Sequence, residues 1–217
     1  MKKLLSLISV FFIIIPCCTG MICRQSYTDV SKNTNPFDSF EVGLITEFSS
    51  QYLEEYFDHS LENDSKYILK VKPKGKINFS FKCYSEPVSV IAVYKGEGIT
   101  NGDNIEIVRY SSTIFWDTNN TDSINTGFVN KMNANEEYLV FLSDKLDYRD
   151  KTVYKTTSCV IAPIFSYTHH DNSVVNGKNN ISSIEYINVK NNEFFVGDNY
   201  SLNVLERAKE KFVLKYT

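Results

Sequence analysis

The sequence contains none of the short motifs that carry familiar enzyme chemistry. Its 217 residues include no G-x-S-x-G nucleophile elbow, no H-E-x-x-H zinc motif and no glycine-rich phosphate loop. Only three residues are histidines, and the 23 basic and 26 acidic residues are spread along the chain without forming a basic stripe. Proteins that neutralise nucleic-acid phosphates need such a stripe. The sequence therefore predicts no catalytic residues, no cofactor and no nucleic-acid partner.

Candidate metal ligands are few and do not share a face. The cluster His169-His170-Asp171 has suitable residue types, but adjacent side chains of an extended segment point in opposite directions. The paired carboxylates Glu136 and Glu137 stand just before an apolar run and suit a turn exposed to solvent. We therefore predict a solvated loop around the histidine pair, and no metal site.

A polar loop at residues 116–127 is the candidate binding site. From Asp117 it begins like a calcium loop, but its sixth and twelfth positions hold Asp122 and Phe128 instead of the Gly and Glu of an EF-hand. The single tryptophan, Trp116, stands at the edge of this loop, where it either anchors a partner or fills the protein core. The binding residues predicted from this pattern are Phe115, Trp116 and Asp117.

The first 20 residues have the pattern of an export signal. Lys2 and Lys3 precede an apolar run at residues 4–16, which only Ser6 and Ser9 interrupt. A buried core helix has a similar composition, but the position behind two lysines at the extreme N-terminus favours the signal. We therefore predict that the rest of the chain lies outside the cytoplasm, either secreted or attached to the membrane by its N-terminus.

Three fates of this segment remain open. The first is cleavage between Gly20 and Met21, which follow the apolar run. The second is an uncleaved anchor, because residues 4–23 approach the roughly 20 that span a bilayer. The third is lipidation of a cysteine, although no candidate follows the small residue that a lipobox needs: Cys17, Cys18 and Cys23.

Two further cysteines, Cys83 and Cys159, lie far from the N-terminus. An isolated pair in an exported domain is a candidate disulfide. Each also lies in an apolar stretch, where a buried free cysteine acts as a small hydrophobic side chain. Both interpretations stay open at this point.

Composition and hydrophobic spacing predict a mainly β protein with flanking helices. The 14 tyrosines and 15 phenylalanines favour strands, because aromatic rings suit a half-buried pleated surface. Short alternating runs separated by Gly and Pro turns indicate about five antiparallel strands, which suggests a small barrel or sandwich. The predicted segments are a signal peptide or anchor (1–20), a tether and amphipathic helix (21–65), a β-barrel (66–168) and a strand–helix extension (169–217).

Two helices are expected to flank the strands. The first begins near Phe40, after a cap at Asp38 or Ser39, and ends at residues 59–63. The tail contains two weak strands and then a helix at residues 200–211. The tail strands and the cap candidates of this second helix are 181–189, 193–196, Asp198 and Asn199.

One family resemblance rests on two stretches within the strand region. The first is SVIAVYKGEGITNGDNIEIVRY at 89–110, and the second is NTGFVNKMNANEEYLVFLSDK at 125–145. The turn and strand motifs in these stretches resemble those of exported bacterial domains in the netrin and tissue-inhibitor-of-metalloproteinase branch of the OB-fold. The resemblance covers residues 67–167 and implies a five-stranded Greek-key barrel. The N-terminal cysteine of the metalloproteinase inhibitors has no counterpart here, so the resemblance carries the fold and not the inhibitory activity.

The sequence as a whole predicts an exported, envelope-associated, non-catalytic domain that binds an unknown protein or envelope ligand. Two alternatives remain, an envelope enzyme with an unrecognised site and a purely structural surface protein. A cleft in which His169, His170 or Asp117 meets cysteine or carboxylate groups would favour the enzyme. A flat surface without a pocket would favour the structural role.

Overall fold

The computed structural model describes Phe12 and residues 14–19, 36–80, 83–110, 113–115, 122–148, 151–158, 160–175 and 183–217. The chain divides into two compact units, 1–36 and 37–217. In the first unit, residues 14–19 are helical. Most of the predicted signal or anchor lies outside the described residues, so its role stays a prediction. Within the described part of the chain, no helix is both long and apolar enough to cross a bilayer.

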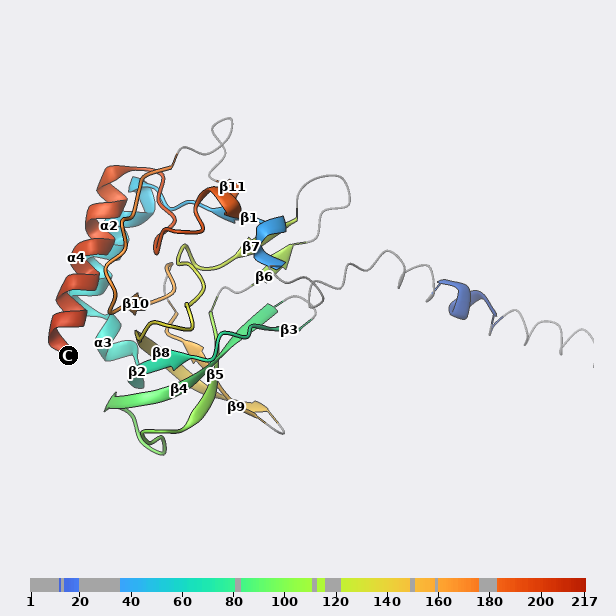
Figure 1. The fold of residues 1–217 in the computed structure, drawn as a ribbon, viewed down its shortest axis with the longest axis horizontal. Helices are drawn as coiled ribbons and strands as arrows, with labels where there is room; N and C mark the ends of the chain where they lie inside the picture. The colour runs from blue at the N-terminus through green and yellow to red at the C-terminus, as the bar shows by residue number, and fades with distance from the viewer. Residues whose placement is uncertain are drawn as a thin grey trace, which may run out of the picture. The chain divides into compact units, whose positions relative to one another are not determined.

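The second unit is built around a closed five-stranded barrel (Figure 1). The strand order β8-β2-β4-β5-β9 is closed by pairing of β9 with β8. Four of these pairings are antiparallel, as expected, and the fifth, between β5 and β9, is parallel. The barrel strands are β2 (Tyr67–Pro73), β4 (Cys83–Lys95), β5 (Asn104–Val108), β8 (Tyr138–Tyr148) and β9 (Lys151–Thr156). The mainly β, OB-like barrel predicted from the sequence is thus confirmed.

Two short strands extend the barrel wall. β3 (Asn78–Ser80) pairs with the start of β4, and β10 (Ile164–Ser166) pairs with β8. β10 begins directly after Pro163, and residues 157–163 separate it from β9. β9 pairs with the second half of β8 and β10 pairs with its first half, so the chain returns to the same strand after Pro163. Pro cannot donate to a strand ladder, and Pro163 lies outside both strands.

The first half of β8 is buried on both faces, as its uniformly apolar sequence predicts. All five side chains from Tyr138 to Leu142 are buried, whereas those from Ser143 onward are half-buried or exposed. Within the buried half, Phe141 packs against Phe212 of the C-terminal helix, with 5.0 Å between the ring centroids. One face of β8 therefore contacts a helix while the other faces the barrel core.

The C-terminal helix α4 (Asn199–Lys215) begins where the sequence predicts. Asp198 is its N-cap, and its carboxylate accepts a hydrogen bond from the backbone N–H of Ser201 at 2.7 Å. Such a cap satisfies one of the backbone donors that the first turn of a helix leaves unpaired. The buried face of α4, which includes Leu205 and Phe212, joins the main hydrophobic core.

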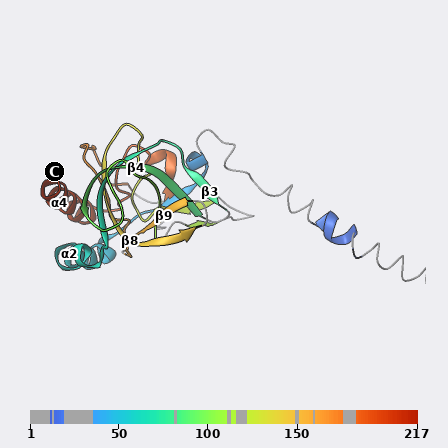
Figure 2. The same cartoon turned by 90° about the horizontal axis from the view of Figure 1, so that it is seen from below.

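Helix α2 (Glu47–His59) lies beside α4 in both views (Figures 1 and 2). Lys211 of α4 forms an ion pair with Asp58 of α2 at 2.8 Å. A short helix, α3 (Leu61–Asp64), follows and leads into the first barrel strand. Phe212 of α4 contacts Phe141 in the buried half of β8, and Phe57 of α2 contacts Phe165 of the neighbouring strand β10.

The predicted start of the first helix, near Phe40, is wrong. Residues Pro36–Ser39 form a 3-10 turn (η2), and residues Glu41–Gly43 form strand β1. In β1, Val42 is paired with Ile184 on one side and Ile124 on the other. Pairing on both edges stabilises the extended conformation, so tertiary contacts override the helical spacing.

β1 belongs to a second, four-stranded sheet above the barrel in the view of Figure 1. Its strand order is β11-β1-β7-β6, in which β1 and β7 are parallel. The two strands predicted in the tail, at residues 181–189 and 193–196, are shorter in the structure. The first reduces to β11 and a 3-10 turn, and the second contributes only isolated bridges at Phe194 and Val196. The remaining elements are β6 (Thr113–Phe115), β7 (Ser123–Asn125), β11 (Ser183–Glu185) and η4 (Tyr186–Asn188).

Candidate functional site

A pocket of about 270 Å³ lies on the outer face of the barrel, over β4, β5 and β9. Alternate residues of these strands, such as Val88 and Ile107, point into the core, so their neighbours face outward. β3 borders the same space, as do the last residue of β8 and the first residue of β9, which flank the turn of the β8–β9 hairpin. We call it the barrel-face pocket, and it is lined by Asn78, Phe79, Cys83, Tyr84, Ser85, Glu106, Val108, Tyr148, Lys151 and Val153.

An ionised carboxylate lies within this mainly apolar lining. Glu106 accepts a hydrogen bond from the Ser85 hydroxyl at 2.6 Å and pairs with Lys151 at 2.6 Å. Burial alone would raise the pKa of Glu106, but hydrogen bonds from Lys151, Ser85 and Asn78 outweigh it and lower the pKa. The pocket therefore combines apolar strand residues with one fixed, paired negative charge.

Three aromatic residues from different strands line the barrel-face pocket. Phe79 comes from β3, and Tyr148, at the end of β8, is 58% exposed. Tyr84 also lines the pocket, and its buried hydroxyl has no hydrogen-bond partner in the described part of the protein. An unsatisfied buried hydroxyl costs about 1–3 kcal/mol.

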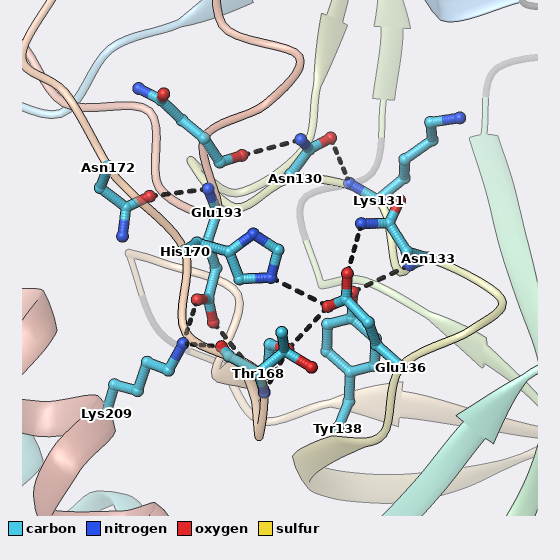
Figure 3. A network of polar contacts seen from close by, with 12 residues as sticks. Asn130, Lys131, Asn133, Glu136, Tyr138, Thr168, His170, Asn172, Glu193 and Lys209 are labelled. Atoms are coloured by element: carbon cyan, nitrogen blue, oxygen red, sulfur yellow. Dashed lines mark hydrogen bonds and ion pairs between the residues drawn. The ribbon is translucent and has the colours of Figure 1, made fainter.

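A separate polar network surrounds Glu136, in the turn before β8 (Figure 3). Its carboxylate lies 2.9 Å from Nε2 of His170 and accepts hydrogen bonds from the hydroxyls of Tyr138 and Ser166 and from the Asn133 amide. Burial raises the pKa of Glu136, but these hydrogen bonds outweigh it and hold the pKa below its ordinary value. The side chains of His170 and Glu136 are only 15% and 16% exposed.

A second carboxylate, Glu193, continues this network on the other side of Ser166. The backbone N–H of Ser166 donates to Glu193 at 2.7 Å, and Lys209 of α4 pairs with Glu193 at 2.5 Å. Burial is the main influence on Glu193 and raises its pKa, although Lys209 opposes the shift. Figure 3 shows the imidazole of His170 between the two carboxylates. The network thus joins the turn before β8, the loop after β10 and helix α4.

A buried ion pair fixes the segment that leads into this network. Arg109, just after β5, pairs with Glu86 of β4 at 2.9 Å, and their side chains are 0% and 3% exposed. Arg109 also donates to the backbone carbonyls of Thr126, Val129 and Asn130. A guanidinium has five N–H donors in a rigid fork, which suits this set of acceptors. The pair therefore attaches residues 126–130 to the barrel.

The attached segment contains a strained turn. Phe128 has a φ of 59°, a left-handed conformation that costs roughly 1–2 kcal/mol for a residue with a Cβ. It directly follows Gly127, which has a φ of 66°. Strain of this kind persists where the surrounding structure determines the conformation, and the Arg109 contacts on both sides of Phe128 provide that support.

The predicted binding residues are only partly described. Trp116 and Asp117 lie outside the described residues, and Phe115 ends β6 with a side chain that is also outside the description. Cys83 is a half-buried free cysteine in the barrel-face pocket, and its predicted partner Cys159 lies outside the described residues. Both the loop site and the disulfide therefore stay predictions.

The prediction for the histidine cluster is right for two residues and wrong for the third. His169 and Asp171 are exposed, and their side chains pair at 3.3 Å. His170 instead turns inward to Glu136, which was expected in a solvated turn. Glu137, the residue after Glu136, pairs with Lys70 on β2. In the described part of the chain, no group of three or more His, Cys, Asp or Glu residues could hold a metal ion.

Sequence reasoning missed the two buried charge networks for different reasons. Glu86 and Arg109 continue the inward-facing alternation of Val88 and Ile107 on neighbouring strands, which is a readable signal for a buried pair. His170 and Glu136 are 34 positions apart and neither follows a periodic pattern. Only the folded chain brings them together.

Comparisons with known proteins do not assign the chain to a family. No model of a protein family matches the chain, and no curated protein matches it. The interpretation of both candidate sites therefore rests on their geometry and chemistry.

Proposed function

We propose that this protein is an exported, envelope-associated binding domain that holds a segment of another protein in the barrel-face pocket. The N-terminal pattern supports an address outside the cytoplasm, with the membrane reached through residues 1–20. The resemblance to the netrin and tissue-inhibitor-like branch of the OB-fold is part of the same proposal. The closed five-stranded barrel is compatible with that resemblance.

The position of the pocket is the observation that carries the proposal. OB-fold barrels bind extended ligands on their second and third strands, between the first–second and fourth–fifth connections. Here β4 and β5 are the second and third barrel strands, β3 lies in the first–second connection, and the β8–β9 hairpin is the fourth–fifth connection. The barrel-face pocket lies where all of these meet.

The chemistry of the lining favours a polypeptide over a nucleic acid. Val108 and Val153 offer apolar surface, and Tyr148 is an exposed aromatic of the kind enriched at protein interfaces. Lys151, the basic residue of the lining, is already paired with Glu106, so the lining offers no unpaired cation to a phosphate. A partner segment with an apolar side chain would bury this surface without leaving a charge unpaired.

Site-specific photo-crosslinking in living cells tests this function. A photoreactive phenylalanine analogue at Tyr148 should give one discrete adduct, whereas the same analogue at Tyr52, an equally exposed position on α2, should not. Val108→Arg places a charge on the outward face of β5 and should abolish the Tyr148 adduct. Equal adducts at both positions, or an adduct that survives Val108→Arg, would contradict binding in the pocket.

A second candidate, an envelope enzyme, is favoured by one observation. His170 meets a carboxylate beside a pocket, and a carboxylate-oriented imidazole is the arrangement of a general base. The test is hydrolysis of a panel of chromogenic esters and glycosides by the full chain. Activity lost in His170→Ala but kept in His169→Ala would support the enzyme, and equal rates in both variants would argue against it.

A further inference from the structure

The polar network around Glu136 borders its own pocket, separate from the barrel face. This pocket has a volume of about 270 Å³, and three stretches of chain line it: residues 129–138, the loop with His170, and residues 190–193. None of its lining residues belongs to the barrel-face pocket. We call it the His170 pocket. Its volume is slightly below the roughly 300–1,000 Å³ of sites for drug-sized molecules, so it suits a smaller ligand.

The walls of the His170 pocket are held in fixed positions. Asn130 donates from its amide to the backbone carbonyls of Lys190 and Asn192, both at 2.8 Å. The amide oxygen of Asn130 accepts from the hydroxyl of Tyr186 and from the backbone N–H of Lys131. Because all of these groups are fixed before a ligand arrives, binding does not have to order them.

Glu136 determines which nitrogen of His170 carries the hydrogen. The lowered pKa of Glu136 keeps its carboxylate ionised, and an ionised carboxylate only accepts hydrogen bonds. Nε2 of His170, 2.9 Å away, must therefore be the donor. In the neutral imidazole Nδ1 is then an acceptor, and it lies on the side of the ring away from Glu136 (Figure 3). No described residue donates a hydrogen bond to it.

The accessible groups of the pocket suit hydroxyls better than a charged ligand. Glu193 is already neutralised by Lys209 and almost completely buried. Other polar residues of the lining are His170, Asn191, Asn133, Lys131 and Lys190, of which Asn133 already donates from its amide to Glu136. A hydroxyl can donate to one such group and accept from another at the same time.

We propose that the His170 pocket binds a small, polyhydroxylated ligand of monosaccharide size, one of whose hydroxyls donates to Nδ1 of His170. An ionised carboxylate has no hydrogen to donate to that nitrogen. Inorganic phosphate keeps one hydroxyl near pH 8, but it would bring two negative charges close to the Glu136 carboxylate. A wholly apolar ligand would leave the amides and the imidazole without partners, which is costly in a confined site. This proposal is independent of the protein partner proposed for the barrel face.

The tautomer provides the first test. Long-range ¹H–¹⁵N NMR of the full chain, recorded near pH 8, where histidine is ordinarily neutral, reports which ring nitrogen carries the hydrogen. We expect the hydrogen on Nε2 of His170. A hydrogen on Nδ1 would overturn the proposal, because the pocket would then offer a donor in place of the acceptor. This readout needs no variant, so it does not depend on the folding of one.

Ligand binding provides the second test, with the neighbouring histidine as the matched control. Glucose, galactose, N-acetylglucosamine, acetate and phosphate are titrated separately at the same pH, with saturation-transfer NMR and calorimetry as readouts. At least one sugar should bind, roughly tenfold more weakly to His170→Ala than to wild type, and with unchanged affinity to His169→Ala. Binding of acetate or phosphate alone, no binding by any sugar, or equal losses in both variants would overturn the proposal.

Discussion

Arg109→Met is the substitution for which the structure gives the sharpest energetic expectation. Methionine fits approximately the volume of the aliphatic part of arginine but carries no charge and no N–H donor. The Glu86 carboxylate would then remain buried without its counter-ion, retaining only the hydrogen bond that it accepts from the backbone N–H of Met132. Three backbone carbonyls would lose the donors that attach residues 126–130 to the barrel.

The expected loss follows from these contacts. Breaking a buried ion pair by removing one partner costs about 3–5 kcal/mol, because a buried charge is left uncompensated. Each carbonyl left without a donor adds to this unless water reaches it, at about 1–3 kcal/mol when it stays dry. We therefore expect Arg109→Met to lower the free energy of unfolding by at least about 4 kcal/mol. Burial opposes the charge of Arg109, but interactions led by the neighbouring Glu86 outweigh it and raise the pKa of Arg109, so the guanidinium stays charged at neutral pH.

A double variant separates the charge from the packing. Arg109→Met combined with Glu86→Leu leaves no uncompensated charge, so it should be more stable than Arg109→Met alone. Urea unfolding followed by circular dichroism gives both free energies, provided that the m-value is unchanged. A loss below about 1 kcal/mol for the single variant, or a double variant no more stable than the single one, would refute the assigned role of this pair.

Three further predictions concern the core, the acid range and export. Phe141→Ala should cost on the order of 3–5 kcal/mol, because its ring is fully buried against α4, and an unchanged melting temperature would show that β8 is peripheral. Because the folded-state pKa of Glu136 lies below its ordinary value of 4.5, this group stabilises the fold above that pH and loses its contribution as the pH falls further. Acid titration of stability should therefore be steeper below pH 4.5 in wild type than in Glu136→Gln, and parallel curves would contradict it. A reporter fused after residue 60 should be found outside the cytoplasm and stay inside when Ile13 and Ile14 become Asp, since each charge costs about 2.5–3.5 kcal/mol at a helix centre. Unchanged export would disprove the signal.

The barrel was predictable because its strands carry their own signals. Alternating or uniformly apolar runs bounded by Gly and Pro mark β2, β4, β5 and β8, and Asp198 marks the start of α4. The second sheet was not predictable in the same way. Its strands are three residues long, too short for a period to show, and each exists because a distant segment pairs with it.

The two candidate sites also differ in how far the sequence predicts them. Glu106 lies on a predicted strand, so its outward-facing position could be inferred from the strand pattern, whereas Tyr148 lies beyond the part of β8 that the sequence predicted. The His170 pocket depends on irregular segments that meet only in the folded chain. His169 and His170 look equivalent in the sequence, yet one is exposed and the other is mostly enclosed, with 15% of its side chain exposed beside Glu136. The difference comes from the path of the loop after β10, which no local pattern encodes.

The second sheet also constrains when the protein can fold. β1 near the start of the described domain lies between β7 from its middle and β11 from near its end, and Ser50 of α2 bonds to Ser201 of α4. Contacts between such distant segments form late, because the loops they close cost entropy before any pairing energy is gained. A chain that crosses a membrane starting from its N-terminus would therefore emerge unable to complete its core until the last helix follows.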